Sequence, residues 1–198
     1  MNKMNNEEQI IDELLRLNSS IVHDALRSKG LMDQTLPPEI KPLKFDKVLV
    51  GKVWTLSGEL EENADVHETL LSWTKFLSNA QPNSVVVCQP NNLSIALMGE
   101  LSAEYLLKKK VRGYITDGGC RDVEFINNIN FPVWSKFNTP KDVVGYWKPD
   151  ELGTTITIGD VTINNNDYVL ADIDGVVIIP KDHIVNILEK TENLISTE

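Results

Sequence analysis

The sequence predicts a layered α/β fold. Two amphipathic helical segments open the chain, strands and helices then alternate, and strands dominate the last third before a final helix. Alternation of strands with helices is typical of α/β folds, but the strand-rich last third does not fit a regular doubly wound sheet. The 198 residues are enough for one domain of ordinary size, so we expect a single domain over residues 1–198.

Both ends of the chain are expected to be helical. Apolar residues at helical spacing predict two helices within about residues 7–29, and a final helix over about 182–195. Ser19 or Ser20 is suited to cap the second helix, because a hydroxyl can accept a hydrogen bond from the first free amides. Gly30 is suited to end that helix.

The middle of the chain is expected to alternate between strands and helices. Residues 47–57 predict a strand in which Gly51 marks a bend or bulge. Residues 99–110 predict a helix with Leu101, Tyr105 and Leu106 on its apolar side. The other expected helical segments are 65–78 and 123–128, and the other expected strands are 84–88, 113–117, 132–135, 154–158, 168–171 and 175–179.

Composition narrows the partners and the compartment. The net charge of −10, from 19 basic and 29 acidic residues, disfavours nucleic acid, because phosphate binding needs clustered Lys and Arg. No apolar stretch approaches the roughly 18 residues of a membrane helix, and the N-terminus lacks the apolar region of a secretory signal. Cys88 lies in an apolar run and is expected in the core, whereas Cys120 lies in a glycine-rich turn where it can be exposed. We therefore expect a reduced, cytoplasmic protein with no nucleic-acid or membrane partner.

Familiar catalytic and phosphate-binding signatures are absent from the sequence. The segment 172–175, Asp-Ile-Asp-Gly, is like the start of a calcium loop, but the downstream Glu of such a loop is missing. We interpret this segment as a turn between two strands.

Chemistry-bearing residues lie instead around the predicted helix over 99–110. Gly99 to Ser102 open this helix directly after an apolar segment, and the unpaired amides of a helix start are suited to bind a carboxylate. Twenty residues separate Glu100 from Arg121, which Asp122 follows. A helix of about 12 residues spans roughly 18 Å, and a returning strand can cover that distance, so both groups are expected at one rim.

These residue types suit a small 2-keto acid. Arg121 can hold a carboxylate or keto oxygen, Asp122 can hold a Mg²⁺ that keeps most of its waters, and Glu100 can move a proton directly or through a water. Together they favour the stabilisation of an enolate. The alternative is structural: Arg121 and Asp122 form a surface ion pair after a glycine turn, and Glu100 only stabilises a helix N-terminus.

The stretch that carries these residues resembles a known family. It reads MGELSAEYLLKKKVRGYITDGGCRDVEFI and is similar to the central signature of the RraA-like family. That family includes the class II 4-hydroxy-4-methyl-2-oxoglutarate/4-carboxy-4-hydroxy-2-oxoadipate (HMG/CHA) aldolases. The resemblance covers roughly residues 18–182. Four other segments fit the family in the same order along the chain: SSIVHDAL, GKVWTLSG, NNLSIALMGE and VLADIDGVVIIP.

The resemblance implies a swivelling β/β/α-type fold, assembled as a homotrimer or as a homohexamer of two trimers, with sites between subunits. It implies a lyase that uses a divalent metal, Mg²⁺ or Mn²⁺, to cleave 4-hydroxy-2-keto diacids. Oxaloacetate decarboxylation is a usual companion activity, because both reactions pass through a pyruvate enolate. The expected partner is therefore a small 2-keto acid like pyruvate or oxaloacetate.

The resemblance also implies a role for each residue of the stretch. The backbone amides that hold the substrate carboxylate belong to the loop of Gly99, Glu100, Leu101 and Ser102. Arg121 binds the keto oxygen and steadies the enolate. Asp122 is the direct metal ligand, and Glu100 orients the catalytic water.

Two features of the family leave alternatives open. It contains non-catalytic regulators that bind an endoribonuclease, and such members can lack the Asp that follows the Arg, so Asp122 favours the enzyme. Aldolase members carry a Glu in their last helix that reaches a neighbouring subunit's site. Glu189, Glu192 and Glu198 are the candidates in this chain.

Overall fold

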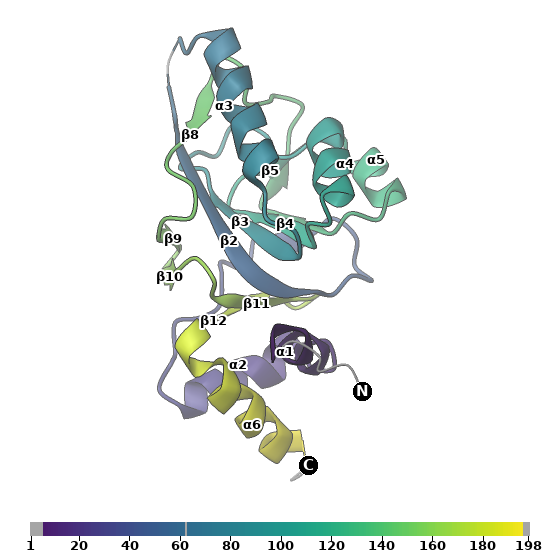
Figure 1. The fold of residues 1–198 in the computed structure, drawn as a ribbon, viewed down its shortest axis with the longest axis vertical. Coiled ribbons are helices and arrows are strands. Elements are labelled where there is room, and N and C mark those ends of the chain that lie inside the picture. Colours follow the sequence, from purple (N-terminus) through teal and green to yellow (C-terminus); the bar gives the residue numbers. More distant parts are fainter. Residues whose placement is uncertain (1–5, 62, 196–198) are drawn as a thin grey trace.

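The computed structural model describes residues 6–61 and 63–195, and its longest strand is β2 (Leu49–Leu60). This strand pairs in parallel with β3 (Ser84–Gln89) and antiparallel with β11 (Tyr168–Ala171). It bends along its length, so the sheet built on it curls (Figure 1). The predicted α/β class is confirmed by this curled sheet and the helices packed on it.

The main sheet contains strands of both directions. Its order is β1 (Lys41–Pro42), β6 (Val133–Ser135), β4 (Gly113–Thr116), β3, β2, β11 and β12 (Val176–Ile179), and β8 (Trp147–Pro149) pairs with the far end of β2. Strands β2, β3, β4 and β6 are mutually parallel, whereas β1, β11 and β12 run antiparallel to their neighbours. Two further pairs lie outside this sheet: β9 (Ile156–Ile158) with β10 (Val161–Ile163), and β5 (Gly119–Cys120) with β7 (Phe137–Asn138).

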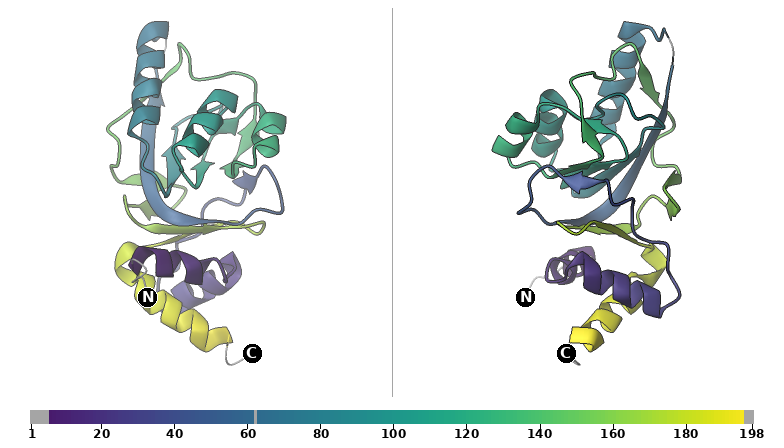
Figure 2. Two further views of the ribbon diagram at one scale, coloured as in Figure 1. Left: turned by 45° about the vertical axis from the view of Figure 1, so that its right-hand side comes forward. Right: turned by 180° about the vertical axis from the view of Figure 1, so that it is seen from behind.

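The helices form two groups at opposite ends of the molecule. One group lies on the β3–β4 side of the curled sheet and consists of α3 (Val66–Asn79), α4 (Glu100–Lys108) and α5 (Val123–Asn128). The other group packs beyond β11 and β12 and consists of α1 (Asn6–Leu14), α2 (Ser19–Ser28), the 3₁₀ turn η1 (Lys181–His183) and α6 (Ile184–Ile195). All views keep the two groups apart, with the sheet between them (Figure 2).

The side chains of β3 point alternately into two hydrophobic clusters, one on each face of the sheet. Val86 and Cys88 belong to the cluster beneath α3 and α4, while Val85 and Val87 belong to the cluster on the opposite face, with β9 and β10. Successive side chains of a strand point to opposite faces, so an uninterrupted apolar run is what a strand covered on both faces requires. A third cluster joins β11 and β12 to α1, α2 and α6.

Several expected details differ in the structure. Asn18, rather than Ser19 or Ser20, caps α2, because its side chain accepts a hydrogen bond from the amide of Ile21 at 2.9 Å. Gly51 pairs in regular register with Val169 and forms no bulge. It is needed for close packing, since a Cβ there would lie 2.7 Å from Cγ2 of Val85.

The short strands are the elements that the sequence did not predict. β1, β5, β7, β8 and β10 contain two or three residues each, which is too short for a period-two pattern to stand out. No helix within residues 6–61 and 63–195 is both long enough and apolar enough to cross a lipid bilayer.

Candidate functional site

The start of α4 and the segment after β5 meet at one point. The backbone amide of Glu100 donates a hydrogen bond of 2.9 Å to Oδ2 of Asp122. Gly99 is the N-cap residue and has no side chain to satisfy this amide, so a residue distant in sequence caps the helix instead. The expectation that the two groups share a rim is confirmed by this contact.

Gly99 makes the close approach possible. A Cβ at this position would lie 2.8 Å from Oδ2 of Asp122 and 2.9 Å from Nε of Arg121. The backbone of Gly99 is extended, with φ −151°, a conformation that any residue adopts. Glycine is therefore required here by the neighbouring side chains and not by its own backbone.

Asp122 has an uncommon backbone conformation. Its φ of 56° and ψ of 36° place it in the left-handed region, where it precedes the first residue of α5. Such a conformation costs most residues other than glycine about 1 kcal/mol or more, but Asp and Asn adopt it more readily, and six other described residues that are not glycine share the positive φ. The tight turn directs the carboxylate back toward α4.

Arg121 lies between two carboxylates. Its Nε is 3.5 Å from Oδ2 of Asp122, and one terminal nitrogen is 2.9 Å from Oδ2 of Asp142. Oδ1 of Asp142 accepts a hydrogen bond from the amide of Val144 at 3.2 Å, which fixes the carboxylate. The sequence analysis missed Asp142, because it lies in an irregular segment with no motif around it.

A pocket of 340 Å³ opens beside Arg121, between α3 and the start of α4. Gly99, Leu101, Ser102 and Arg121, all expected at a site, contribute to its wall. The remaining lining residues come from α3, α4 and two loops: Leu70, Trp73, Thr74, Leu77, Ala96, Leu97, Met98, Tyr105, Asp142, Val143 and Val144. This volume is near the lower end of small-ligand sites, which are roughly 300–1,000 Å³.

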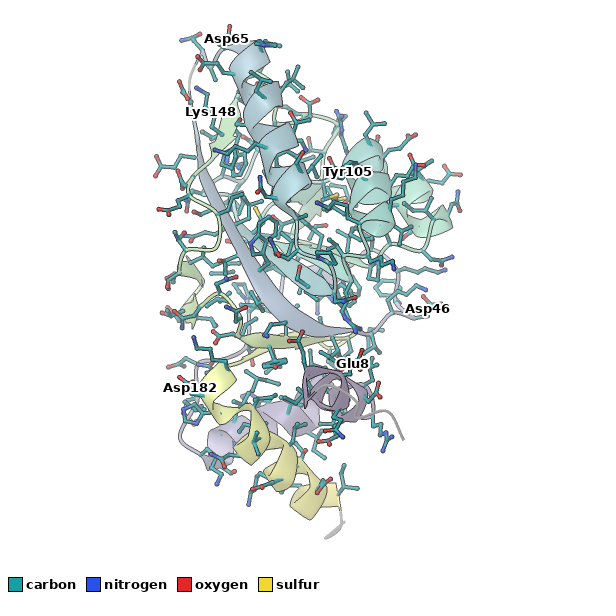
Figure 3. All side chains as sticks on the ribbon, viewed as in Figure 1. Glu8, Asp46, Asp65, Tyr105, Lys148 and Asp182 are labelled. Carbon is teal, nitrogen blue, oxygen red and sulfur yellow. The ribbon has the colours of Figure 1, made fainter. Side chains whose placement is uncertain are left out.

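Two side chains of α4 lie elsewhere than the sequence predicts. Leu101 and Tyr105 were expected on the apolar, core-facing side, but Leu101 is 77% exposed and Tyr105 is 41% exposed. They form the rim of the pocket, while Leu106 alone of the three predicted apolar residues is fully buried. Figure 3 shows Tyr105 on α4, in the half of the molecule away from Asp182.

The site offers three kinds of group to a small acid. The amides of Leu101 and Ser102 are in the first turn of α4, where amides have no partner within the helix. Arg121 supplies a guanidinium at the same end of the helix. Glu100 is exposed next to them and lies outside the pocket wall.

Asp122 is the residue best suited to bind a hard cation. Its side chain is 38% exposed, and its Oδ1 accepts no hydrogen bond from the described part of the chain. Residues 6–61 and 63–195 contain no group of three or more His, Cys, Asp or Glu side chains with the geometry of a metal cluster. One carboxylate oxygen, with water supplying most other ligands, fits Mg²⁺ better than metals that need several protein ligands.

Neither cysteine is available as a nucleophile. Cys120 is fully buried, contrary to the expectation that its turn can expose it, and Cys88 is buried as predicted. Burial raises the pKa of each thiol to about 12, so almost no thiolate is present near neutral pH.

The acids of the last helix lie far from the pocket within one chain. Glu189 and Glu192 are on α6, which packs on α2 at the opposite end of the molecule from α4 (Figure 1). Glu198 lies outside the described residues. Any contribution of these acids to a pocket requires a second subunit.

Fold and site together define a mixed α/β protein with an Arg-Asp pair held against a glycine-initiated helix. Comparison with protein families gives the class a name. Residues 19–178 match the RraA-like family model, described as Aldolase/RraA, and the chain belongs to this family.

Individual relatives of the chain have diverse names. It is 28% identical over 193 residues to protein DlpA of Legionella pneumophila, covering 96% of this chain but only 30% of DlpA. It is 26% identical over 191 residues to a Halalkalibacterium halodurans protein named "Putative 4-hydroxy-4-methyl-2-oxoglutarate aldolase", covering 94% of this chain and 83% of that protein. The crystal structure of Streptomyces coelicolor RraAS2, from the RNase ES inhibitor RraA family, has a TM-score of 0.85 at 21% identity over 96% of this chain and 94% of that one.

Proposed function

We propose that this protein is a divalent-metal-dependent lyase that acts on small 2-keto acids through a pyruvate enolate. Its reactions would be the aldol cleavage of 4-hydroxy-4-methyl-2-oxoglutarate, the decarboxylation of oxaloacetate, or both. One observation carries the proposal: Asp122, Arg121 and the first amides of α4 meet at one end of a small pocket.

The substrate would be held by its 2-keto acid end. The amides of Leu101 and Ser102 are free to donate to its carboxylate, since Asp122 occupies only the amide of Glu100. Arg121 would donate to the keto oxygen, where negative charge grows as the enolate forms. Both interactions strengthen with that charge, as catalysis requires.

The remaining roles fall to the two acids at the rim. Asp122 would hold Mg²⁺ or Mn²⁺ through its free Oδ1, and the bound ion would supply Lewis acidity at the keto acid. Glu100 would orient a water that removes the proton of the 4-hydroxyl group and later returns a proton to the enolate. The exposure of Glu100 leaves room for that water.

Pyruvate release tests the proposal directly. Purified protein would be assayed with oxaloacetate and with 4-hydroxy-4-methyl-2-oxoglutarate, each with Mg²⁺, with Mn²⁺ and with EDTA. We expect metal-dependent pyruvate release from at least one substrate. The ratio of the two release rates shows whether the protein favours aldol cleavage or decarboxylation. No release from either substrate by folded, metal-supplied protein contradicts the proposal.

We also propose that the active assembly is a homotrimer or homohexamer. The two helices beside the pocket, α3 and α4, carry several exposed apolar side chains, of which Leu70, Leu101 and Tyr105 line the pocket: Val66, Leu70, Leu71, Leu101 and Tyr105. Exposed apolar surface, where it is contiguous, is typical of protein interfaces. Sedimentation equilibrium measures the state, and a stable monomer at micromolar concentration contradicts this part of the proposal.

A second candidate function is a non-catalytic regulator of ribonuclease activity that acts by protein–protein binding. The likeness to RraAS2 and the net charge of −10, which can mimic RNA toward a basic surface, favour it. Pull-down from lysate at low salt tests it. Recovery of a ribonuclease by the wild-type protein and equally by an Asp122→Asn variant supports the regulator, because the candidate lyase site is then not needed.

A further inference from the structure

The hydroxyl of Ser102 makes an unusual hydrogen bond for a residue inside a helix. Its Oγ accepts a bond of 2.9 Å from the indole Nε1 of Trp73, which lies on α3. A serine or threonine inside a helix commonly donates its hydroxyl proton to a carbonyl three or four residues earlier. Thr69 does both, because it accepts a bond from the amide of Gly145 and also donates to the carbonyl of Val66.

The proton of the Ser102 hydroxyl is left for the pocket. A serine hydroxyl has one proton to donate and two lone pairs that accept. Within residues 6–61 and 63–195 this hydroxyl donates to no acceptor, and the carbonyls of Met98 and Gly99 each accept a backbone amide at 2.9 Å. Ser102 is 9% exposed and lines the pocket. Because buried polar groups rarely stay without a partner, a ligand in the pocket is suited to supply the missing acceptor.

Packing holds the Trp73 indole in place. Its ring centroid lies 4.9 Å from that of Phe76 and 5.9 Å, edge to face, from that of Trp147. Trp147 is fully buried, and its Nε1 donates to the carbonyl of Pro90 at 2.8 Å. An indole fixed in this way keeps its N–H against the Ser102 hydroxyl and leaves the hydroxyl proton directed away from that N–H. The bond lies within one chain, so a neighbouring subunit that completes the pocket would leave it in place.

We infer that the hydroxyl of Ser102 donates a hydrogen bond to the carboxylate of the 2-keto acid, and that Trp73 is the positioning residue that orients this hydroxyl. This role belongs to the side chain of Ser102 and adds to that of its backbone amide. It rests on the proposed function for the identity of the ligand. The carboxylate then receives three donors at the start of α4: this hydroxyl and the amides of Leu101 and Ser102.

Removal of the hydroxyl changes KM rather than kcat. The carboxylate is charged both before and during enolate formation, so the bond stabilises both states equally. We expect Ser102→Ala to raise KM at least about tenfold and to leave kcat within about twofold of wild type. Ser102→Thr keeps a hydroxyl, and we expect its KM to stay within about threefold of wild type. A KM that is unchanged in Ser102→Ala, or raised equally in Ser102→Thr, overturns the inference.

Trp73→Phe tests the positioning role. Phenylalanine keeps an aromatic ring in the packed cluster but has no N–H to donate. We expect this change to raise KM about threefold in the wild-type background and to have no further effect in the Ser102→Ala background, because the indole acts on the substrate only through the hydroxyl. Equal effects in the two backgrounds overturn the role of Trp73.

Ser72→Ala is the matched control for the loss of a hydroxyl. Ser72 precedes Trp73 on α3, and its hydroxyl donates to the carbonyl of Thr69 at 2.9 Å, so it is already engaged within its own helix. We expect its KM to equal that of wild type. A KM raised as much as in Ser102→Ala means that the effect is not specific to the pocket, and it overturns the inference.

Sedimentation equilibrium separates ligand binding from assembly. We expect wild type, Ser102→Ala and Ser72→Ala to assemble equally at the same concentration. If the acceptor of the Ser102 hydroxyl lies on a neighbouring subunit instead, Ser102→Ala weakens assembly and leaves the affinity for pyruvate unchanged. That result overturns the inference.

Calorimetry with pyruvate and Mg²⁺ distinguishes a failure of this inference from a failure of the lyase proposal. If neither substrate releases pyruvate, but wild type binds pyruvate at least about tenfold more tightly than Ser102→Ala, the lyase proposal fails and the role of the hydroxyl stands. If wild type releases pyruvate and both proteins bind it equally, the lyase stands and the role of the hydroxyl fails. Neither release nor binding of pyruvate by wild type overturns both.

Discussion

Two aspartate turns in this molecule use the same device. Asp122 and Asp172 each follow a strand, and each carboxylate accepts a hydrogen bond from a backbone amide in the first turn of a distant helix. The bond from Glu100 to Asp122 is 2.9 Å and caps α4, and the bond from Ser19 to Asp172 is 2.7 Å and joins α2 to the sheet. Both turns also contain glycine, so their sequences give little reason to separate them.

The two carboxylates differ in how many of their oxygens lack a hydrogen bond from the described part of the chain. Asp172 is 8% exposed and also accepts bonds from Oγ of Ser19 at 2.7 Å, the amide of Asp174 at 3.0 Å and the amide of Gly175 at 3.3 Å. Both of its oxygens accept hydrogen bonds, and the predicted turn between two strands is confirmed. Asp122 has one engaged oxygen and a side chain that is 38% exposed. Unused bonding capacity, rather than the presence of an aspartate beside glycine, distinguishes a candidate reactive group from a structural one.

The largest effect is expected from Asp122→Asn. The amide oxygen can still cap α4, and Asn tolerates a left-handed backbone, but the negative charge is lost. We expect metal-dependent kcat/KM to fall about 1,000-fold, roughly 4 kcal/mol, while the free energy of unfolding changes by less than about 1 kcal/mol. Steady-state kinetics and urea unfolding measure the two quantities. Activity within about tenfold of wild type would mean that Asp122 is only a helix cap.

The equivalent change at the other turn should affect stability instead. Asp172→Ala leaves Ser19 and two turn amides without their acceptor, and we expect a loss of about 3 kcal/mol in the free energy of unfolding. Turnover per folded molecule should be unchanged. Asp174→Ala is the matched control, because Asp174 is exposed and its one side-chain bond, to Ser20, is 3.5 Å long. Equal losses in the two variants would contradict a structural role for Asp172.

Substitutions of a glycine close to each turn, Gly99 on α4 beside Asp122 and Gly175 beside Asp172, are expected to have smaller effects. Gly99→Ala places a Cβ within 2.9 Å of both Asp122 and Arg121, so one of them has to move. We expect kcat/KM to fall about 30-fold, roughly 2 kcal/mol, as the geometry loosens. In Gly175→Ala the new Cβ has no atom within 4 Å, and the residue does not need a left-handed backbone. If both variants keep full activity, the close approach at Gly99 is not required.

Local periodicity explains how much of the fold could be predicted. The pattern around Val85 to Cys88 is contained in adjacent residues, so the strand was recognised, and the meeting of Glu100 with Asp122 followed from the lengths of a helix and a strand. The burial of Cys120 was missed, because β5 has two residues and its cover comes from distant segments. The sequence shows that a helix has an apolar face, but it does not show which part of the chain packs against that face. Leu101 was for this reason wrongly expected in the core.

The smallest expected effect concerns a feature of the Asp122 turn that the Asp172 turn lacks among the described residues: a cation, Arg121, that pairs with a second carboxylate, Asp142. Asp142 holds the guanidinium of Arg121 at 2.9 Å, although both side chains are about one-third exposed, so their pairing contributes less than about 1 kcal/mol to stability. A substrate that binds Arg121 has to compete with Asp142. We therefore expect Asp142→Asn to lower KM about threefold at low salt, and less at high salt, because the competing charge is gone.

An acid outside the pocket provides the control for that change. Asp24 forms an exposed ion pair of 2.7 Å with Arg27 on α2, at the opposite end of the molecule, so Asp24→Asn should leave KM unchanged. The direction of the effect at Asp142 then decides between two roles. A lower KM means that Asp142 competes with the substrate anion for Arg121. A higher KM, restored by Asp142→Glu, means that it orients the guanidinium for the substrate, and in that case the turn at Asp122 relies on a fixed cation as much as on a free carboxylate oxygen.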